Sequence, residues 1–401
     1  MPQISHIARA LPPSGIRKFF DLVVATQGVI SLGVGEPDFV TPWSIREAAI
    51  YSIEKGQTTY TSNYGLIELR ELIAEHLHGR YGLDYHPADE ILVTVGVSEG
   101  MDLAMRVIVD PGDEVIVPEP CYVSYKPCIE LAGGVAVGIE TTPAEKFLPT
   151  MEQLEAALSP RTKAILLGYP SNPTGAIMPR ERLEQIVAFA ERNDLFIVSD
   201  EIYDRLTYEG EHVSVASIPG ARDRTILLNG FSKAYAMTGW RIGYACAPRD
   251  VLGTMNKIHA YTALCTPITA QRAAIEALKS GEQAVRDMVD HYNRRRRLIV
   301  AGFSDLGLDC HLPQGAFYAF PSITSTGLTS EEFAEKLLFE EKVAVVPGNA
   351  FGAGGAGHIR CSYATAIDKI EIAIQRIGRF VNRHRADVAD RERRGEAVGV
   401  G

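Results

Sequence analysis

The chain has 401 residues, of which 46% are hydrophobic, and a formal net charge of -10. Its length exceeds what one hydrophobic core usually supports, so we expect two domains, and its acidity argues against a nucleic-acid-binding surface. No apolar run is long enough to cross a membrane, the six cysteines form no C-x-x-C pair and the histidines form no H-E-x-x-H motif. We therefore expect a cytoplasmic protein with no metal site and no membrane or nucleic-acid partner.

Strand-like apolar runs alternate with stretches of helical periodicity through the middle of the chain. Many runs are rich in Val, Ile and Leu, which is typical of strands buried on both faces. Helices are predicted between many of them, for example at 151–158 and 180–192. The alternation predicts an α/β fold, with a large domain over residues 46–285 whose mostly parallel sheet is flanked by helices. The predicted strands are 91–95, 114–117, 134–139, 164–168, 196–199, 225–229 and 243–247.

The last third of the chain has a different pattern, in which helices and short strands are mixed. This pattern predicts a smaller α+β domain over residues 286–385, which residues 1–45 are expected to join. Residues 386–401 are charged and end in glycine, so this tail is expected to fray. The predicted elements are a long helix at 282–306, strands at 317–320, 343–346 and 359–362, and helices at 330–339 and 366–383.

Lys233 follows the predicted strand 225–229 closely and lies among small and apolar residues. A lone lysine is usually a solvated surface charge. In apolar surroundings, however, the amine loses hydration, its pKa falls and it becomes nucleophilic. Such an amine suits Schiff-base chemistry with a carbonyl compound. Arg241 follows in the same segment, and its guanidinium could grip a phosphate.

Other residues that follow predicted strands could complete a site for a phosphorylated aldehyde cofactor. One strand runs into Val97 and Ser98, where a helix start would offer free backbone N–H groups to a phosphate. Asp200 could pair with a ring nitrogen, Asn172 could bind a phenolic oxygen and Tyr122 could stack on a ring. Taken singly, Ser98 could be an ordinary helix cap, Asp200 would more simply be a helix cap, and the segment around Asn172 would be a turn. Because α/β sheets bind ligands at the carboxyl ends of their strands, the combination predicts one site.

These residues resemble class I and II aminotransferases, the fold-type I pyridoxal-phosphate enzymes. The resemblance extends from Gly35-Glu36-Pro37-Asp38-Phe39 to Gly357-His358-Ile359-Arg360 and is most specific in the segment 232–241. It implies the aminotransferase fold, pyridoxal 5'-phosphate as cofactor and a homodimer with shared active sites. The roles that it implies are the Schiff-base amine for Lys233, the ring-nitrogen partner for Asp200, contacts to the ring oxygen for Asn172 and Tyr203, ring stacking for Tyr122, phosphate binding for Val97, Ser98 and Arg241, α-carboxylate binding for Arg360 with Gly35 nearby, and contact with the neighbouring subunit's phosphate for Tyr60.

The resemblance also implies amino transfer between an L-amino acid and a 2-oxo acid such as 2-oxoglutarate. Ser98 occupies the position where one aspartate-specific branch has a lysine. Glu99 would repel a carboxylate if it pointed inward, and His259 is the one possible cation in 258–264, where other relatives have an arginine. We therefore expect aromatic or apolar donors to be preferred over aspartate, with ring contacts from Tyr64, Tyr122 and Tyr261.

Three alternatives to this function stay open. The first is an aspartate aminotransferase and the second a pyridoxal-phosphate β-lyase, because one fold supports several reactions. The third is a non-catalytic regulator, which would need a DNA-binding segment that we do not expect here. A dinucleotide site is a separate possibility, because residues 352–357 fit G-x-G-x-x-G. Such a site requires a following helix, whereas 358–363 has the pattern of a strand, so we interpret the glycines as a flexible hairpin loop.

Overall fold

The computed structural model describes residues 3–11 and 26–394, with side chains described as far as residue 385. Its main feature is a seven-stranded sheet in the order β2-β8-β7-β6-β5-β3-β4. All neighbouring strands pair in parallel except β8, which is antiparallel to both β2 and β7. The strands are β2 (Ile91–Thr94), β3 (Glu114–Glu119), β4 (Val135–Glu140), β5 (Thr162–Gly168), β6 (Phe196–Asp200), β7 (Thr225–Gly230) and β8 (Gly243–Cys246).

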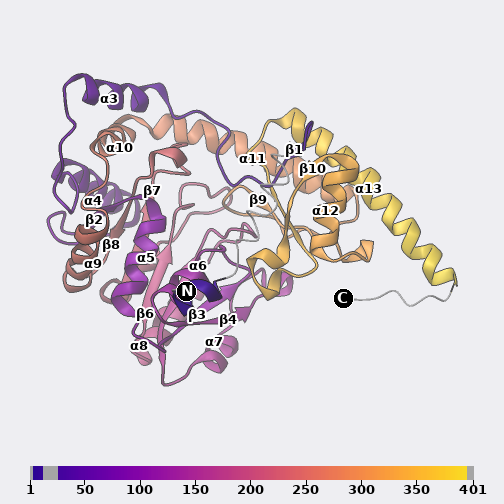
Figure 1. Cartoon of the computed structure of the whole chain (residues 1–401), viewed down its shortest axis with the longest axis horizontal. Helices are drawn as coiled ribbons and strands as arrows, with labels where there is room; N and C mark the ends of the chain where they lie inside the picture. Colours follow the sequence, from indigo (N-terminus) through magenta and orange to yellow (C-terminus); the bar gives the residue numbers. More distant parts are fainter. Residues whose placement is uncertain (1–2, 12–25, 395–401) are drawn as a thin grey trace.

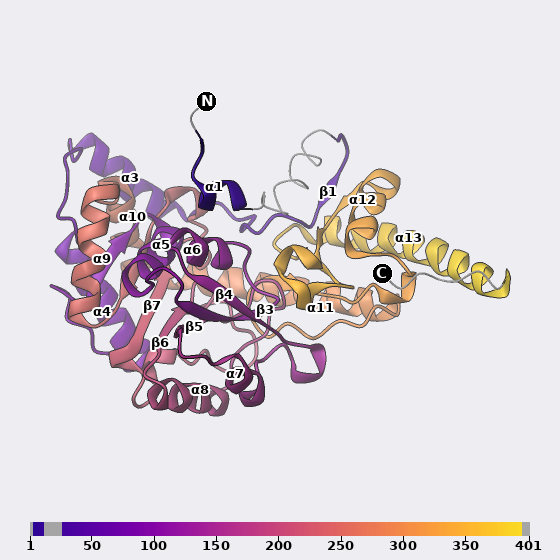
Figure 2. The same ribbon diagram turned by 60° about the horizontal axis from the view of Figure 1, so that its bottom comes forward.

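Helices cover both faces of this sheet because successive residues of a strand point to opposite faces and both sets are apolar here. Leu166 and Val198 pack on the face covered by α5 and α9, whereas Ile165 and Ile197 pack on the face covered by α8. Figure 2 shows α5 and α6 on one side of the strands and α7 and α8 on the other. The helices are α5 (Gly96–Ile108), α6 (Tyr125–Leu131), α7 (Met151–Ala157), α8 (Arg180–Arg192) and α9 (Arg249–Thr262).

Three further helices pack together at the β2 end of the sheet (Figure 1). They are α3 (Trp43–Glu54), α4 (Ile67–Tyr81) and α10 (Ile268–Ser280). The buried face of α4 is formed by residues at helical spacing, including Leu69, Ile73 and Leu77. This spacing aligns them in one stripe against the core, which positions the loop between α3 and α4 at the edge of the molecule.

The C-terminal part of the chain builds two small sheets packed with helices (Figure 1). Strands β11, β12 and β9 form an antiparallel sheet, and β1 pairs in parallel with β10, which joins the N-terminal segment to this part. The domain boundaries near residues 45, 285 and 385 stay predictions. The elements are α1 (His6–Ala10), β1 (Ile30–Ser31), α11 (Glu282–Asp305), β9 (Tyr318–Ala319), α12 (Ser330–Glu341), β10 (Val343–Ala344), β11 (Val346–Pro347), β12 (Ile359–Ser362) and α13 (Ile367–Arg394).

The predicted α/β architecture is confirmed, and the seven predicted strands of the large sheet are present with ends that differ by at most two residues. Two predicted elements are wrong in extent. The strand predicted at 343–346 is split into β10 and β11, because the chain changes pairing partner at Val345. Helix α13 continues past residue 383 to Arg394, since its last turns are rich in Arg, include two Ala and contain no Gly or Pro. Residues 395–401 of the predicted tail lie outside the described residues.

The glycine-rich segment 352–357 connects the antiparallel strands β11 and β12, as a hairpin loop does. It forms a short 3-10 turn, Ala353–Gly355, and leads directly into β12 rather than into a helix. The Ala353 N–H donates to Glu119 Oε2 at 2.8 Å, which ties the loop to the end of β3. The segment therefore lacks the helix N-terminus that a dinucleotide site requires. Among the described helices, none is both long enough and apolar enough to span a membrane.

Candidate active site

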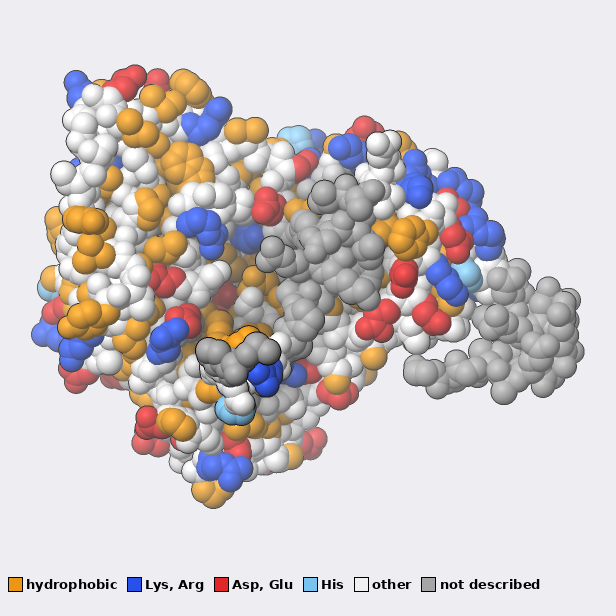
Figure 3. All heavy atoms as spheres, viewed as in Figure 1, with side chains coloured by type: hydrophobic (Ala, Val, Ile, Leu, Met, Phe, Trp, Pro, Cys, Tyr) orange, Lys and Arg blue, Asp and Glu red, His pale blue; other side chains and the backbone are white. Residues whose placement is uncertain are grey.

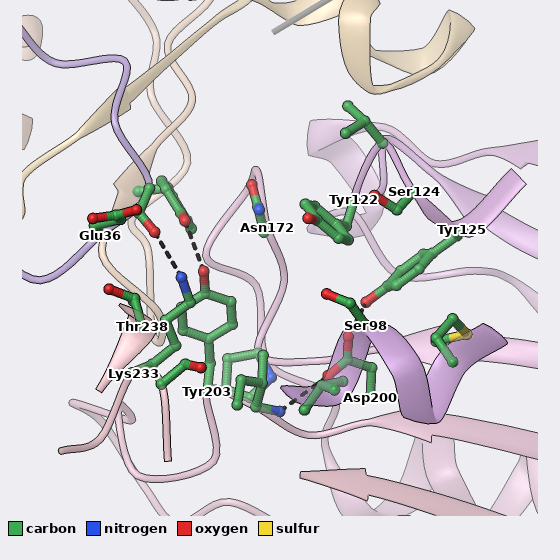
Figure 4. A pocket seen from close by; sticks show the side chains of 18 of the residues that line it. Glu36, Ser98, Tyr122, Ser124, Tyr125, Asn172, Asp200, Tyr203, Lys233 and Thr238 are labelled. Atoms are coloured by element: carbon green, nitrogen blue, oxygen red, sulfur yellow. Dashed lines mark hydrogen bonds between the residues drawn. The ribbon is translucent and has the colours of Figure 1, made fainter. Parts of the chain in front are cut away.

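A cavity of about 780 Å³ lies where the carboxyl ends of the parallel strands meet the small sheet. All but one of the predicted site residues line it, and Figure 4 shows many of their side chains converging. Parallel strands deliver their following loops to one edge, so residues far apart in sequence meet there. The predicted residues in the cavity wall are Gly35, Val97, Ser98, Tyr122, Asn172, Asp200, Tyr203, Lys233, Arg241 and Arg360.

Lys233 projects into this cavity from the turn that follows β7 (Figure 4). Its Nζ donates to the carbonyl oxygen of Gly35 at 2.7 Å and lies 5.8 Å from the ring centroids of Tyr203 and Phe317. The surrounding protein removes water from the amine and lowers its pKa to about 8. A substantial fraction of the amine is therefore unprotonated near neutral pH, which is the form that attacks a carbonyl carbon.

Asp200 ends β6 and is only 7% exposed. Tyr125 Oη donates to its Oδ2 at 2.9 Å and the Ile202 N–H donates to its Oδ1 at 3.2 Å, yet neither donor is a cation. Burial raises the pKa of this carboxyl to about 6, although the two hydrogen bonds oppose the rise. A buried carboxylate that contacts only neutral donors suits a cationic ligand group.

Tyr125 is a site residue that the sequence reasoning missed. The lack of a side chain at Gly168 makes room for its hydroxyl, because a Cβ there would collide with the phenol oxygen. Its ring packs edge-on against Tyr122 with the centroids 5.6 Å apart. The available signal was the i,i+3 spacing of the two tyrosines, which would place both rings on one side of a helical turn.

The turn from β2 into α5 and Arg241 form one end of the cavity. Gly96 has a φ of 73°, and a Cβ on it would lie 2.8 Å from an Arg241 guanidinium nitrogen. Arg241 Nη1 donates to the carbonyl oxygen of Thr238 at 2.9 Å. The guanidinium therefore lies beside the first turn of α5, where Val97 and Ser98 are found. Free N–H groups at a helix start together with a guanidinium favour a phosphate.

Arg360 on β12 is only 2% exposed and contacts no carboxylate among the described residues. Its Nη1 donates to Asn172 Oδ1 at 2.9 Å, and its Nη2 donates to the carbonyl oxygen of Gly33 at 2.6 Å. The guanidinium carbon lies 4.5 Å from the ring centroid of Tyr318 and 4.9 Å from that of Phe351. A buried cation held only by neutral partners favours binding of an anion such as a carboxylate.

Tyr203 and Tyr318 share a hydrogen bond of 2.7 Å between their hydroxyl oxygens. Both rings are buried, and both line the cavity. Figure 4 shows Tyr203 there. Tyr318 was not predicted, because nothing in its local sequence distinguishes it from a core tyrosine of a short strand. Only the packing of β9 against Tyr203, in the segment that follows β6, brings it to the site.

Tyr60 is the predicted residue that does not reach this cavity. It lies between α3 and α4 and is 81% exposed. Two of the three tyrosines expected to give ring contacts also do not line the cavity of this chain, so their ring contacts stay a prediction. Tyr261, near the end of α9, is 93% exposed, and the ring of Tyr64 packs beside Arg70 at 5.6 Å. Of these three tyrosines, Tyr122 lines the cavity.

Glu99 and His259 are paired with each other outside the cavity. Glu99 Oε1 lies 2.7 Å from His259 Nδ1, and its other oxygen accepts the Val95 N–H. His259 is fully buried. Glu99 therefore does not point into the cavity, and His259 does not supply a cation to it. The basic side chains in the cavity wall are Lys233, Arg241 and Arg360.

Comparisons with known proteins find similarity over nearly the whole chain. Residues 27–377 match the family described as aminotransferase class I and II. A putative aminotransferase of Bacillus subtilis strain 168, YugH, is 52% identical over 95% of this chain and 98% of its own. Aromatic-amino-acid aminotransferase 2 of Thermococcus litoralis is 44% identical over 91% of this chain and 95% of its own. The structure of Thermus thermophilus aspartate aminotransferase with maleate is 41% identical, covers 94% of this chain and 100% of its own, and superposes with a TM-score of 0.89.

The chain belongs to the aminotransferase class I and II family. It is therefore a transaminase of fold type I, which confirms the predicted class of enzyme. Members of this family use pyridoxal phosphate. Relatives similar to this chain carry the names of both aromatic and aspartate aminotransferases, so membership of the family leaves the amino donor to be argued from the cavity.

Proposed function

We propose that this enzyme transfers the amino group of an L-amino acid with an aromatic or apolar side chain to a 2-oxo acid such as 2-oxoglutarate. Pyridoxal phosphate is the proposed cofactor. The observation that carries the choice of donor is the set of charges in the cavity wall. The three cations of the wall are Lys233, Arg241 and Arg360. We assign them to the cofactor aldehyde, the cofactor phosphate and the substrate α-carboxylate, so none remains for a second carboxylate. Free thiols at all six cysteines support a reducing location, and we place the enzyme in the cytoplasm.

The residues present fit the proposed cofactor. The start of α5 with Ser98 and Arg241 would hold its phosphate, and Lys233 would hold its aldehyde carbon. Asp200, which contacts no cation among the described residues, would pair with the ring nitrogen. Tyr122 would stack on the ring, and Asn172 and Tyr203 would bind the ring oxygen. Bound there, pyridoxal phosphate supplies an aldehyde for the amino group and a ring that spreads charge from the substrate Cα.

The chain's own groups would position the substrate and move its protons. Arg360 would bind the α-carboxylate in a fork, because its guanidinium is buried and free of carboxylates. Lys233 Nζ would take the proton from the substrate Cα, a task that suits a base whose pKa is about 8. The carbonyl oxygen of Gly35, which accepts from Nζ, would hold the amine in place between these steps.

The side chain of the donor would enter a cavity that offers Tyr122 and no spare cation. Ser98 is neutral, and Glu99 and His259 are paired with each other. Apart from the three cations and the carboxylate assigned to the ring nitrogen, the charged side chain in the cavity wall is Glu36, an anion, which would disfavour a second carboxylate further. A carboxylate buried without a cation costs several kcal/mol in rough terms, whereas an apolar side chain carries no such cost. Aspartate should therefore be the poorer donor. The second carboxylate of 2-oxoglutarate meets the same lack of a cation, so the proposal also requires that this longer side chain reach a residue outside the cavity wall of this chain.

The test compares kcat/KM for phenylalanine, tyrosine, leucine, alanine and aspartate with 2-oxoglutarate as the common acceptor. We expect the aromatic donors to exceed aspartate by at least tenfold. Ser98→Lys is the matched variant, since it adds the absent cation and should raise the value for aspartate selectively. A preference of the native enzyme for aspartate would refute the proposal, and release of ammonia and pyruvate without an acceptor would indicate a β-lyase.

We also propose that two copies form a homodimer with shared active sites. Apolar side chains are exposed over the side of the molecule that carries α3, α4 and α9 (Figure 3), and a second copy would cover them. They include Trp43, Ile50, Tyr51, Ile53, Tyr60 and Tyr261. Tyr60 would then reach the phosphate bound by the other copy. Mixing Tyr60→Phe with Lys233→Ala chains should restore one working site per mixed dimer, and no recovery of activity would contradict sharing.

A further inference from the structure

The hydrogen bond between Tyr318 and Tyr203 connects the two halves of the site. Tyr318 is on β9 of the small sheet, whereas Tyr203 follows β6 of the large one. Their hydroxyl oxygens are 2.7 Å apart, and both side chains are buried. A hydroxyl can donate one hydrogen bond and accept others. When one hydroxyl of a pair donates to the other, the second hydroxyl keeps its own O–H free to donate to a third group.

Two further contacts hold Tyr318 in place. The guanidinium of Arg360 lies over its ring, 4.5 Å from the centroid. On another side, a Cβ at Gly35 would lie 2.6 Å from the Tyr318 hydroxyl, so the bare Cα of this glycine leaves room for it. The Gly35 carbonyl oxygen accepts from Lys233. Tyr318 therefore lies against Arg360, beside Gly35 and within hydrogen-bond distance of Tyr203.

We propose that Tyr318 is a positioning residue with two roles. Its hydroxyl donates to the Tyr203 oxygen, so that the Tyr203 O–H is directed at the ring oxygen of the cofactor. The ring of Tyr318 supports the guanidinium of Arg360. The inference rests on the proposed function of the cavity. A hydrogen bond donated to the ring oxygen withdraws electron density from this oxygen. The oxygen then stabilises the proton on the cofactor–lysine linkage less strongly, so the pKa of the linkage falls. Two hydroxyls in series strengthen this effect, because each hydrogen bond polarises the next.

The experiment is a pH titration of the absorbance of the bound cofactor in the holoenzyme. Tyr318→Phe removes the hydroxyl and keeps the ring, and it should raise the pKa of the linkage by roughly 0.5–1 unit, the effect of one hydrogen bond. Tyr203→Phe should raise it by more. In the Tyr203→Phe background, adding Tyr318→Phe should produce no further rise, because the hydroxyl then has no oxygen to act through.

The matched control is Tyr363→Phe, which removes another buried hydroxyl from this region. Tyr363 donates to the Ala316 carbonyl oxygen at 3.2 Å and does not line the cavity, so the linkage pKa should stay at the native value. The support of Arg360 is tested separately by substrate kinetics. Tyr318→Phe should leave KM within about twofold of the native value, whereas Tyr318→Leu, which lacks the ring, should raise KM severalfold for all donors.

An unchanged linkage pKa in Tyr318→Phe would refute the positioning role. The role would also be refuted if Tyr318→Phe raised the linkage pKa by the same amount in the Tyr203→Phe background as in the native chain. The titration requires bound cofactor but no turnover. A chain that forms the coloured linkage without transferring amino groups would therefore defeat the proposed function alone. A chain that forms no linkage with pyridoxal phosphate would overturn both.

Discussion

Replacing Asp200 by asparagine should stabilise the cofactor-free protein even though it damages the enzyme. The carboxyl is buried and receives hydrogen bonds only from the Tyr125 hydroxyl and the Ile202 N–H. Without a cationic ligand group beside it, the charged form is destabilised by loss of hydration. Asparagine has nearly the same shape and no charge, so it removes this cost.

The magnitude follows from the pKa of this carboxyl, which burial raises from 3.8 to about 6. A difference of roughly 2 units corresponds to about 3 kcal/mol of unfolding free energy. Because the folded-state pKa is raised, the carboxyl contributes fully to stability below pH 3.8, and this contribution is lost as the pH rises through about 6. Asp200→Asn should therefore exceed the native chain by about 3 kcal/mol at pH 8 and by about 1.5 kcal/mol at pH 5.

The assay is urea unfolding of both cofactor-free chains at pH 5 and pH 8, at one fixed protein concentration. Asp305→Asn, a change at an exposed position near the end of α11, is the control and should show no such pH dependence. Adding pyridoxal phosphate should reverse the order, because the native carboxylate then gains the ring nitrogen as a partner. If Asp200→Asn were no more stable at pH 8, or if its advantage were the same at both pH values, the reasoning would be wrong.

Three other predictions concern single groups of the site. The rate at which cofactor-free enzyme captures pyridoxal phosphate should rise with pH around a midpoint near 8, the pKa to which burial lowers Lys233; stopped-flow absorbance measures it, and a midpoint near 10.5 would contradict the burial argument. Tyr125→Phe, which removes one donor from Asp200, should lower kcat about two- to tenfold with little change in KM, and an equal rise in KM would point to misplaced substrate instead. Arg360→Leu should lower kcat/KM for every donor by about 30-fold or more, since the α-carboxylate loses its cation; a loss confined to some donors would move the carboxylate site elsewhere.

The sequence determined the large sheet and ten of the residues in the cavity wall. Short continuous apolar runs such as residues 164–168 are typical of strands buried on both faces, so this strand was recognised without a structure. Because such strands align in parallel, Asn172, Asp200 and Lys233 had to emerge at the same edge. The identity of these residues then specified the chemistry, since a buried amine, a carboxylate and a phosphate-binding turn suit few ligands.

Tertiary structure alone decided which distant side chains became partners. Tyr318 reaches Tyr203, and Glu99 turns away from the cavity toward His259, although each pair is separated by more than a hundred residues. Local sequence does not encode such contacts, because they depend on how the small sheet packs against the large one and on how α9 packs against α5. A hydrogen bond forms only when donor and acceptor lie within hydrogen-bonding distance. For residues far apart in the sequence, this distance is set by the packing of whole helices and strands rather than by their composition.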